Sequence, residues 1–105
     1  MDLKGQKRET EEIFREIAAM QALPETASVN FQFLVEDEDA DGAAFAAAAA
    51  ALGYAVEWLE DEEEVAVTTA TEPLSVEGLW AHEERLTLLA AEFGLEPDGW
   101  GFFAG

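Results

Sequence analysis

The sequence predicts an α+β domain, because segments with the two-residue alternation of strands take turns with segments of helical periodicity. Its 105 residues, half of them hydrophobic, are enough to form one core without disulfide bonds, and the chain has no cysteine. We therefore expect a single domain over residues 9–105, which begins with a helix, preceded by a flexible tail over residues 1–8.

The helix that opens the domain is expected over residues 9–23. Ile13, Ile17 and Met20 repeat at helical spacing and form one apolar stripe. Pro24 ends the helix, since proline disfavours helical geometry in the residue before it. Two places are open for this helix: one face of the sheet, or its side.

The first strand is expected over residues 28–35, where apolar and polar residues alternate and predict one buried and one polar face. An alanine-rich helix is expected to follow over residues 42–52, because alanine has the highest helix propensity. Asp39 or Asp41 can serve as its N-cap, and Gly53 suits a left-handed C-terminal cap.

A hairpin is expected next, with strands over residues 54–59 and 65–71 and an acidic turn over residues 60–64. Glu72 and Pro73 are expected to break the second of these strands, because proline cannot donate a backbone hydrogen bond to a sheet.

A second long helix is expected over residues 76–93, since its apolar residues fall mostly on one side. Ser75 can cap its start, and Gly94 ends it. A short strand rich in aromatic residues over residues 98–103 completes the pattern.

The order of elements after the first helix, β-α-β-β-α-β, is the ferredoxin-like pattern. It predicts a four-stranded antiparallel sheet with two helices on one face. Right-handed crossovers place strand 65–71 between strands 28–35 and 54–59. The same rule places strand 28–35 beside strand 98–103.

The charge is distributed unevenly along the chain. Residues 1–15 hold four of the 24 acids and four of the five bases, so residues 16–105 hold the other 20 acids, the base Arg85 and the whole formal charge of −19. Such a surface repels nucleic acid and anionic membranes and attracts a basic protein partner. Solubility alone is the simpler explanation of the acid. The sequence shows no secretory signal or membrane-spanning run, so a cytoplasmic location is expected.

Two acidic runs are expected to meet in the fold. One follows strand 28–35 and the other follows strand 54–59, and these strands run parallel with one strand between them. Their carboxyl ends therefore lie at the same edge of the sheet, roughly 10 Å apart. Glu92, Glu96 and Asp98 are expected nearby. We call the two runs the acidic rim, which consists of Glu36, Asp37, Glu38, Asp39, Asp41, Glu60, Asp61, Glu62, Glu63 and Glu64.

Asp37, Asp39 and Asp41 have the opening spacing of a helix-loop-helix calcium site. The twelfth position of such a loop needs a bidentate Glu, but that position is Ala48 here. A strand rather than a helix also precedes the loop, so this kind of site is rejected. Weak binding of a divalent cation at the acidic rim is kept as an alternative, and no metal ligand or cofactor is assigned.

No arrangement of side chains in the sequence predicts catalysis. His82 has no second His and no Cys as a partner, and it is expected on a solvated helix face beside Glu83 and Glu84. Ser75 is better explained as a helix cap than as a nucleophile, because no motif places a base near it. An enzyme with a carboxylate site that no motif reveals is kept as an alternative, and no catalytic residue is assigned.

Three stretches of the chain are similar to a known family. LGYAV at 52–56, LLAAEFG at 88–94 and DGWG at 98–101 resemble the ribonuclease E inhibitor family, of the regulator of ribonuclease activity B type, over residues 9–103. The resemblance implies the ferredoxin-like fold and a non-catalytic protein that binds the endoribonuclease of the RNA degradosome and alters its activity. The motif positions, expected to be structural, are Gly53, Tyr54, Asp98, Gly99, Trp100 and Gly101. The two glycines around the Trp indicate either tight backbone packing or positive φ, with an indole that is packed close.

The leading hypothesis is therefore a regulator that inhibits or modulates a ribonuclease E-type endoribonuclease through protein–protein contact. The acidic rim would meet a basic, arginine-rich segment of the enzyme, because the guanidinium fork matches carboxylates. There it would compete with RNA phosphate. Direct binding of nucleic acid or membrane is not expected, and another basic protein is the alternative partner.

Overall fold

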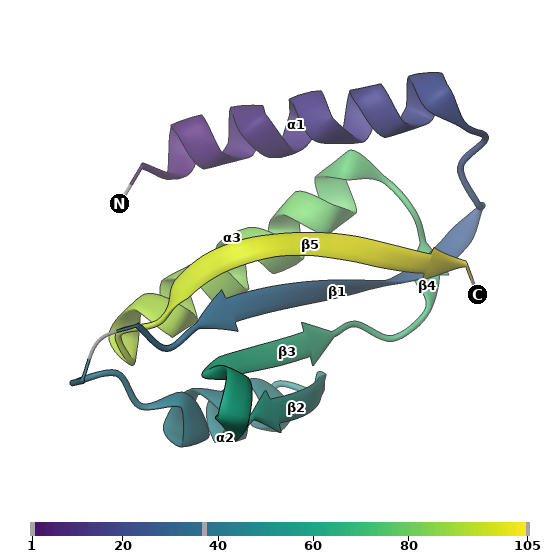
Figure 1. Cartoon of the computed structure of the whole chain (residues 1–105). Helices are drawn as coiled ribbons and strands as arrows, with labels where there is room; N and C mark the ends of the chain where they lie inside the picture. Colours follow the sequence, from purple (N-terminus) through teal and green to yellow (C-terminus); the bar gives the residue numbers. More distant parts are fainter. Residues whose placement is uncertain (1, 37, 105) are drawn as a thin grey trace.

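The computed structural model describes residues 2–36 and 38–104. Within them the chain forms three α-helices and a five-stranded antiparallel sheet (Figure 1), which confirms the predicted α+β class. The helices are α1 (Leu3–Met20), α2 (Gly42–Ala51) and α3 (Val76–Glu92), and a short 3₁₀ turn, η1, spans Glu60–Glu62. The strands are β1 (Thr26–Leu34), β2 (Ala55–Leu59), β3 (Glu64–Thr68), β4 (Glu72–Pro73) and β5 (Glu96–Ala104).

Strand β1 lies in the middle of the sheet, with β3 on one side and β5 on the other (Figure 1). Phe31 of β1 stands opposite Val67 of β3 and opposite Trp100 of β5. Strand β2 pairs with the outer side of β3. The strand neighbours that the crossover rule predicts are therefore confirmed.

The sheet has five strands where the sequence predicts four. The segment that begins at residue 64 pairs with β1 as β3, leaves it, and pairs with it again as β4. The Thr69 hydroxyl accepts a hydrogen bond from Val29 N–H at 2.9 Å, so a side chain replaces a backbone bond of the ladder there. Pairing resumes at β4, where Glu72 stands opposite Ala27. The expected break at Glu72 and Pro73 is wrong, and the interruption lies at residues 69–71 instead.

The core lies between the sheet and helices α2 and α3, which cover one face of it (Figure 1). Val29, Phe31 and Phe33 of β1 are buried and the polar residues between them are not, as the alternation predicts. The rings of Phe33 and Phe45 meet edge to face, with centroids 5.0 Å apart. Among the helices of residues 2–36 and 38–104, none covers the opposite face of the sheet (Figure 1).

Helix α1 begins six residues earlier than the predicted helix and ends three residues earlier. The Asp2 carboxylate accepts a hydrogen bond from Gly5 N–H at 2.9 Å and caps the early start. Residues 3–8 of the expected tail are thus the first turns of this helix. Of the two places open to it, α1 takes the side of the sheet, next to α3 (Figure 1).

The caps of the other two helices agree with the predictions. Asp41, one of the two candidates, accepts from Ala44 N–H at 3.0 Å, and Ser75 accepts from Gly78 N–H at 3.0 Å. Gly53 follows α2 with a φ of 99°, which is the left-handed conformation of a C-terminal cap. No helix in residues 2–36 and 38–104 is both long and apolar enough to cross a membrane.

The packing of Phe45 predicts a large loss of stability on truncation. Phe45→Ala should lower the free energy of unfolding by about 3–5 kcal/mol, because the ring is fully buried against the sheet. Met20→Ala is the control, since that side chain is 85% exposed and its loss should cost less than about 0.5 kcal/mol. Urea denaturation measures both values. Equal losses in the two variants would contradict the packing described.

Candidate functional site

Backbone hydrogen bonds hold both acidic runs at one end of the sheet. Val35 N–H, just after β1, donates to the Glu63 carbonyl in the turn between β2 and β3 at 2.8 Å. Asp41 N–H, just before α2, donates to the Phe93 carbonyl at the end of α3 at 2.9 Å. The runs that follow β1 and β2 are therefore brought together, and the junction between α3 and β5 lies with them.

Carboxylates from three segments interact at this end. A hydrogen bond with Glu96, together with the charges of Glu96 and Asp98, raises the pKa of Glu36. Burial raises the pKa of Glu64, and the charges of Glu62 and Asp98 add to the rise. We call these residues the carboxylate cluster: Glu36, Glu62, Glu64, Glu96 and Asp98. The cluster contains members of both acidic runs and also Glu96 and Asp98 of β5, which the sequence analysis expects nearby.

Most of the acidic rim is exposed on turns, and a few members are tied into the fold. Asp41 caps α2, and Glu64 is the half-buried first residue of β3. Glu63 has a φ of 53°, a left-handed conformation that few side chains adopt, and it closes the hairpin. Asp37 lies outside the described residues. The exposed members are Glu36, Glu38, Asp39, Asp41, Glu60, Asp61, Glu62 and Glu63.

The geometry of the described residues gives a cation site no support. In residues 2–36 and 38–104, no group of three or more His, Cys, Asp or Glu side chains is arranged to hold a metal ion. In the calcium-like spacing, Asp41 is engaged as a helix cap.

A cleft of about 630 Å³ separates the N-terminal half of α1 from the start of β5. Gln6 belongs to its α1 wall, Trp100 belongs to its β5 wall, and Glu83 of α3 lies between them. No base among the described residues lines it. The other acids of the lining are Asp2, Glu9 and Asp98. Since Asp98 also belongs to the carboxylate cluster, the cleft adjoins the acidic end of the sheet.

Glu83 is a buried carboxylate with no ion pair to a base in the described part of the chain. The residue is only 5% exposed, and its Oε2 and Oε1 accept hydrogen bonds from the Gln6 amide and the Thr10 hydroxyl, both at 2.7 Å. Burial raises the pKa of Glu83, the two hydrogen bonds oppose the rise, and the charge of Glu9 adds to it. These contacts dock α1 onto α3, which explains why α1 starts before residue 9.

Sequence reasoning places His82 on a solvated helix face beside Glu83 and Glu84, but His82 is half-buried and Glu83 is buried. A signal for Glu83 is present in the sequence. It lies four residues after Leu79 and three before Leu86, within the buried stripe of α3. An acid in an apolar stripe indicates that polar groups from another element are packed over it.

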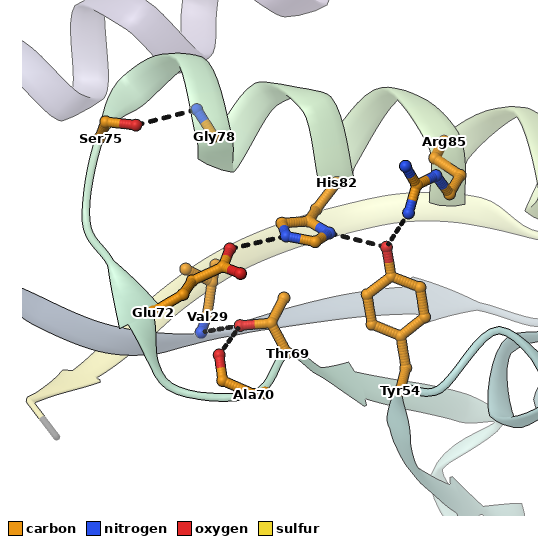
Figure 2. Close-up of polar contacts among 9 residues, drawn as sticks. All are labelled: Val29, Tyr54, Thr69, Ala70, Glu72, Ser75, Gly78, His82 and Arg85. Atoms are coloured by element: carbon orange, nitrogen blue, oxygen red, sulfur yellow. Dashed lines mark hydrogen bonds and ion pairs between the residues drawn. The ribbon is translucent and has the colours of Figure 1, made fainter.

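His82 belongs to a chain of hydrogen bonds that joins α3, β4 and the start of β2 (Figure 2). Its Nδ1 lies 2.7 Å from the Tyr54 hydroxyl and its Nε2 lies 2.7 Å from Glu72 Oε1. Arg85 Nη1 donates to the same Tyr54 hydroxyl at 3.2 Å. If the imidazole carries its proton on Nε2, each donor meets one acceptor from the guanidinium to the carboxylate. Sequence reasoning missed this network, because its members come from segments distant in the chain.

A bulge at the start of β5 lies where three residues of the family motif, Asp98, Gly99 and Trp100, line the cleft. The pairing of β5 with β1 shifts between Pro97 and Gly99, so Asp98 is an extra residue in the strand. Gly99 has a φ of 128°, which confirms the expected positive φ, whereas Gly101 does not share it. Trp100 packs against the core and also lines the cleft.

The fold, the cleft and the carboxylate cluster together define a class of protein. It is a small α+β domain that gathers carboxylates both in a cleft and at one end of its sheet. A family model described as regulator of ribonuclease activity B matches residues 7–102. The chain belongs to this family, which is one of regulators of ribonuclease activity rather than of catalysts. The resemblance drawn from the sequence is confirmed. No curated protein matches the chain.

The burial of Glu83 predicts a pH-dependent stability difference. Glu83→Gln keeps the shape, because its oxygen can accept from Gln6 and its amide can donate to Thr10. The pKa of Glu83 is raised from 4.5 in the folded state, so the ionised native state is penalised near neutral pH. The penalty vanishes below pH 4.5, where the carboxyl is protonated both folded and unfolded. The variant should therefore be more stable than the wild type near neutral pH.

This gain should shrink as the pH falls through the raised pKa of Glu83 towards 4.5. Denaturant unfolding of both proteins across this range measures the difference. Glu84→Gln, at an exposed neighbouring position, is the control. If the difference in free energy of unfolding between Glu83→Gln and the wild type changes with pH no more than that of the control, the folded protein does not penalise the charge of Glu83.

The network of Figure 2 predicts energetic coupling between Tyr54 and Glu72 through His82. Tyr54→Phe should lower the free energy of unfolding by roughly 1–2 kcal/mol, because two hydrogen bonds at its half-buried hydroxyl are lost. A double-mutant cycle with Glu72→Gln should give a coupling energy above about 0.5 kcal/mol. If the free-energy losses of the two single variants add up to that of the double variant, Tyr54 and Glu72 are not coupled through His82.

Proposed function

We propose that this protein inhibits or modulates a ribonuclease E-type endoribonuclease by binding it, without chemistry of its own. Membership in the regulator of ribonuclease activity B family supports regulation of a ribonuclease. The formal charge of −19 and the meeting of both acidic runs at one end of the sheet support a basic partner. The observation that carries most weight is that backbone hydrogen bonds hold these runs together, so the residues of the carboxylate cluster stay close despite their like charge.

The acidic rim would receive an arginine-rich segment of the enzyme. A hydrogen bond with Glu96 and burial are the main causes of the raised pKa values of Glu36 and Glu64, and the charges of neighbouring carboxylates add to both. A cationic segment would relieve this added repulsion, so binding would gain from charges that repel one another in the free protein. Arginine suits such a surface, because its planar fork can bind a carboxylate through two parallel hydrogen bonds. A segment held here is withdrawn from RNA phosphate, which would lower the affinity of the enzyme for its substrate.

The remaining expectations belong to the same proposal. The surface charge argues against direct contact with nucleic acid or with an anionic membrane, and a cytoplasmic location fits a regulator of ribonuclease activity. If β4 is treated as a continuation of β3 on the same side of β1, the sheet has the four-stranded ferredoxin-like order. We propose that class for the domain.

The proposal predicts salt-sensitive binding of a peptide made of repeated Arg-Ser-Gly units. Isothermal titration should show binding at about 50 mM salt that weakens markedly at about 200 mM, because exposed charges are screened within about a Debye length. The triple variant Glu60→Lys, Asp61→Lys and Glu62→Lys should lose about tenfold or more in affinity. These three residues are exposed and form η1.

A matched control separates the acidic rim from net charge. Glu12→Lys, Glu16→Lys and Glu84→Lys change the charge by the same amount at exposed positions on α1 and α3. This variant should lose clearly less affinity than the rim variant. Equal losses would leave only a non-specific charge effect, and binding that ignores salt would remove the mechanism. A parallel titration with calcium tests the cation alternative.

A further inference from the structure

We propose that the cleft between α1 and β5 is a receptor for one arginine side chain of a protein partner. Glu83 would bind the guanidinium group, and Trp100 would pack against its plane. This inference rests on the proposed function for the basic nature of the partner, and it adds a specific pocket to the broad attraction of the acidic rim.

The size and position of the cleft suit an arginine side chain together with part of the segment that carries it. Its volume of about 630 Å³ lies within the range of roughly 300–1,000 Å³ that is typical of small-molecule sites. It adjoins the carboxylate cluster through Asp98, which lines the cleft and also acts on Glu36 and Glu64. A segment that lies on the acidic end of the sheet can therefore reach the cleft with one of its residues.

The hydrogen bonds that Glu83 accepts leave acceptor positions unused on both of its oxygens. A carboxylate has about four acceptor positions on its two oxygens. The Gln6 amide uses one position on Oε2, and the Thr10 hydroxyl uses one on Oε1. Each oxygen thus keeps capacity for one more hydrogen bond, and a guanidinium fork supplies two parallel N–H groups at that spacing.

The charge of Glu83 favours a cationic occupant over a neutral one. Carboxylates are rarely this buried unless a cation accompanies them, and in the described residues the partners of Glu83 are neutral. Asp2 and Glu9 also line the cleft and add to its negative potential. A bound guanidinium would supply the missing counter-charge in a place where water screens it little.

Trp100 distinguishes arginine from lysine and from a metal ion. An indole attracts cations, and the flat guanidinium stacks on it better than a hydrated ammonium does. The described residues hold no group of three metal-binding side chains here. The motif Asp98–Gly101 would then have a binding role in addition to the structural role that the sequence predicts.

The test uses three peptides that differ at one residue: acetyl-Gly-Gly-Arg-Gly-Gly-amide, and the same peptide with lysine or with neutral citrulline. Amide and indole N–H signals of the ¹⁵N-labelled full chain report binding. The arginine peptide should shift the signals of Trp100 and Gly99 saturably, the lysine peptide should bind several-fold more weakly, and the citrulline peptide should leave them unmoved. Equal shifts from the arginine and citrulline peptides would overturn the proposal.

Two variants remove the pocket by different routes. Glu83→Gln deletes the counter-charge in a shape that still satisfies Gln6 and Thr10, and Glu9→Lys places a cation at an exposed position that lines the cleft. Each should weaken the arginine peptide about tenfold. The rim variant at Glu60, Asp61 and Glu62 should retain the Trp100 shift, since none of these residues lines the cleft.

The two proposals fail separately. If the arginine-rich peptide still binds in a rim-dependent way but the single-arginine peptide leaves Trp100 unmoved, the cleft is not a receptor and the acidic rim stands. If the single-arginine peptide binds the cleft while the rim variant has no effect on the longer peptide, the pocket stands and the rim mechanism fails.

Discussion

The mutual repulsion of carboxylates held at one end of the sheet is the constraint on which the rest of the structure depends. Two backbone hydrogen bonds, from Val35 to Glu63 and from Asp41 to Phe93, hold the acidic segments together. The pKa of Glu36 is raised by a hydrogen bond with Glu96 and by the charge of that neighbour, so keeping these carboxylates ionised side by side has a free-energy cost. Burial of the aromatic core beneath β1 offsets that cost. This surface is the one for which we propose a cationic partner, because opposite charge would relieve the repulsion.

Glu83 is a further carboxylate without a basic partner among the described residues, and it lies in the interior. Its carboxylate organises the contact between α1 and α3, because the Gln6 amide and the Thr10 hydroxyl both turn to it. The helix that closes the cleft is thus held by a charge that lacks a basic partner among the described residues. The side chain that docks α1 also lines the cleft to which Trp100 belongs, so the proposed receptor and the packing of α1 share Glu83.

Much of the fold follows from local pattern. Alternation predicts β1, and the helix caps at Asp41 and Ser75 are correct because a cap needs only its own neighbours. Other features depend on contacts between distant segments, which periodicity does not record. The early start of α1 depends on Glu83, and the fifth strand depends on a hydrogen bond to the Thr69 side chain. The meeting of the acidic runs could be predicted because topology alone dictates it; the cleft could not.

The most direct test of the central claim is the effect of this protein on a purified ribonuclease E-type endoribonuclease that keeps its basic segments. The measurement is the initial rate of RNA cleavage as the protein is added at low and at high salt. The account predicts a saturable change in rate that is lost in the rim variant and weakened by salt, because exposed charges carry the contact. A rate that stays constant at every concentration, even at low salt, would contradict it.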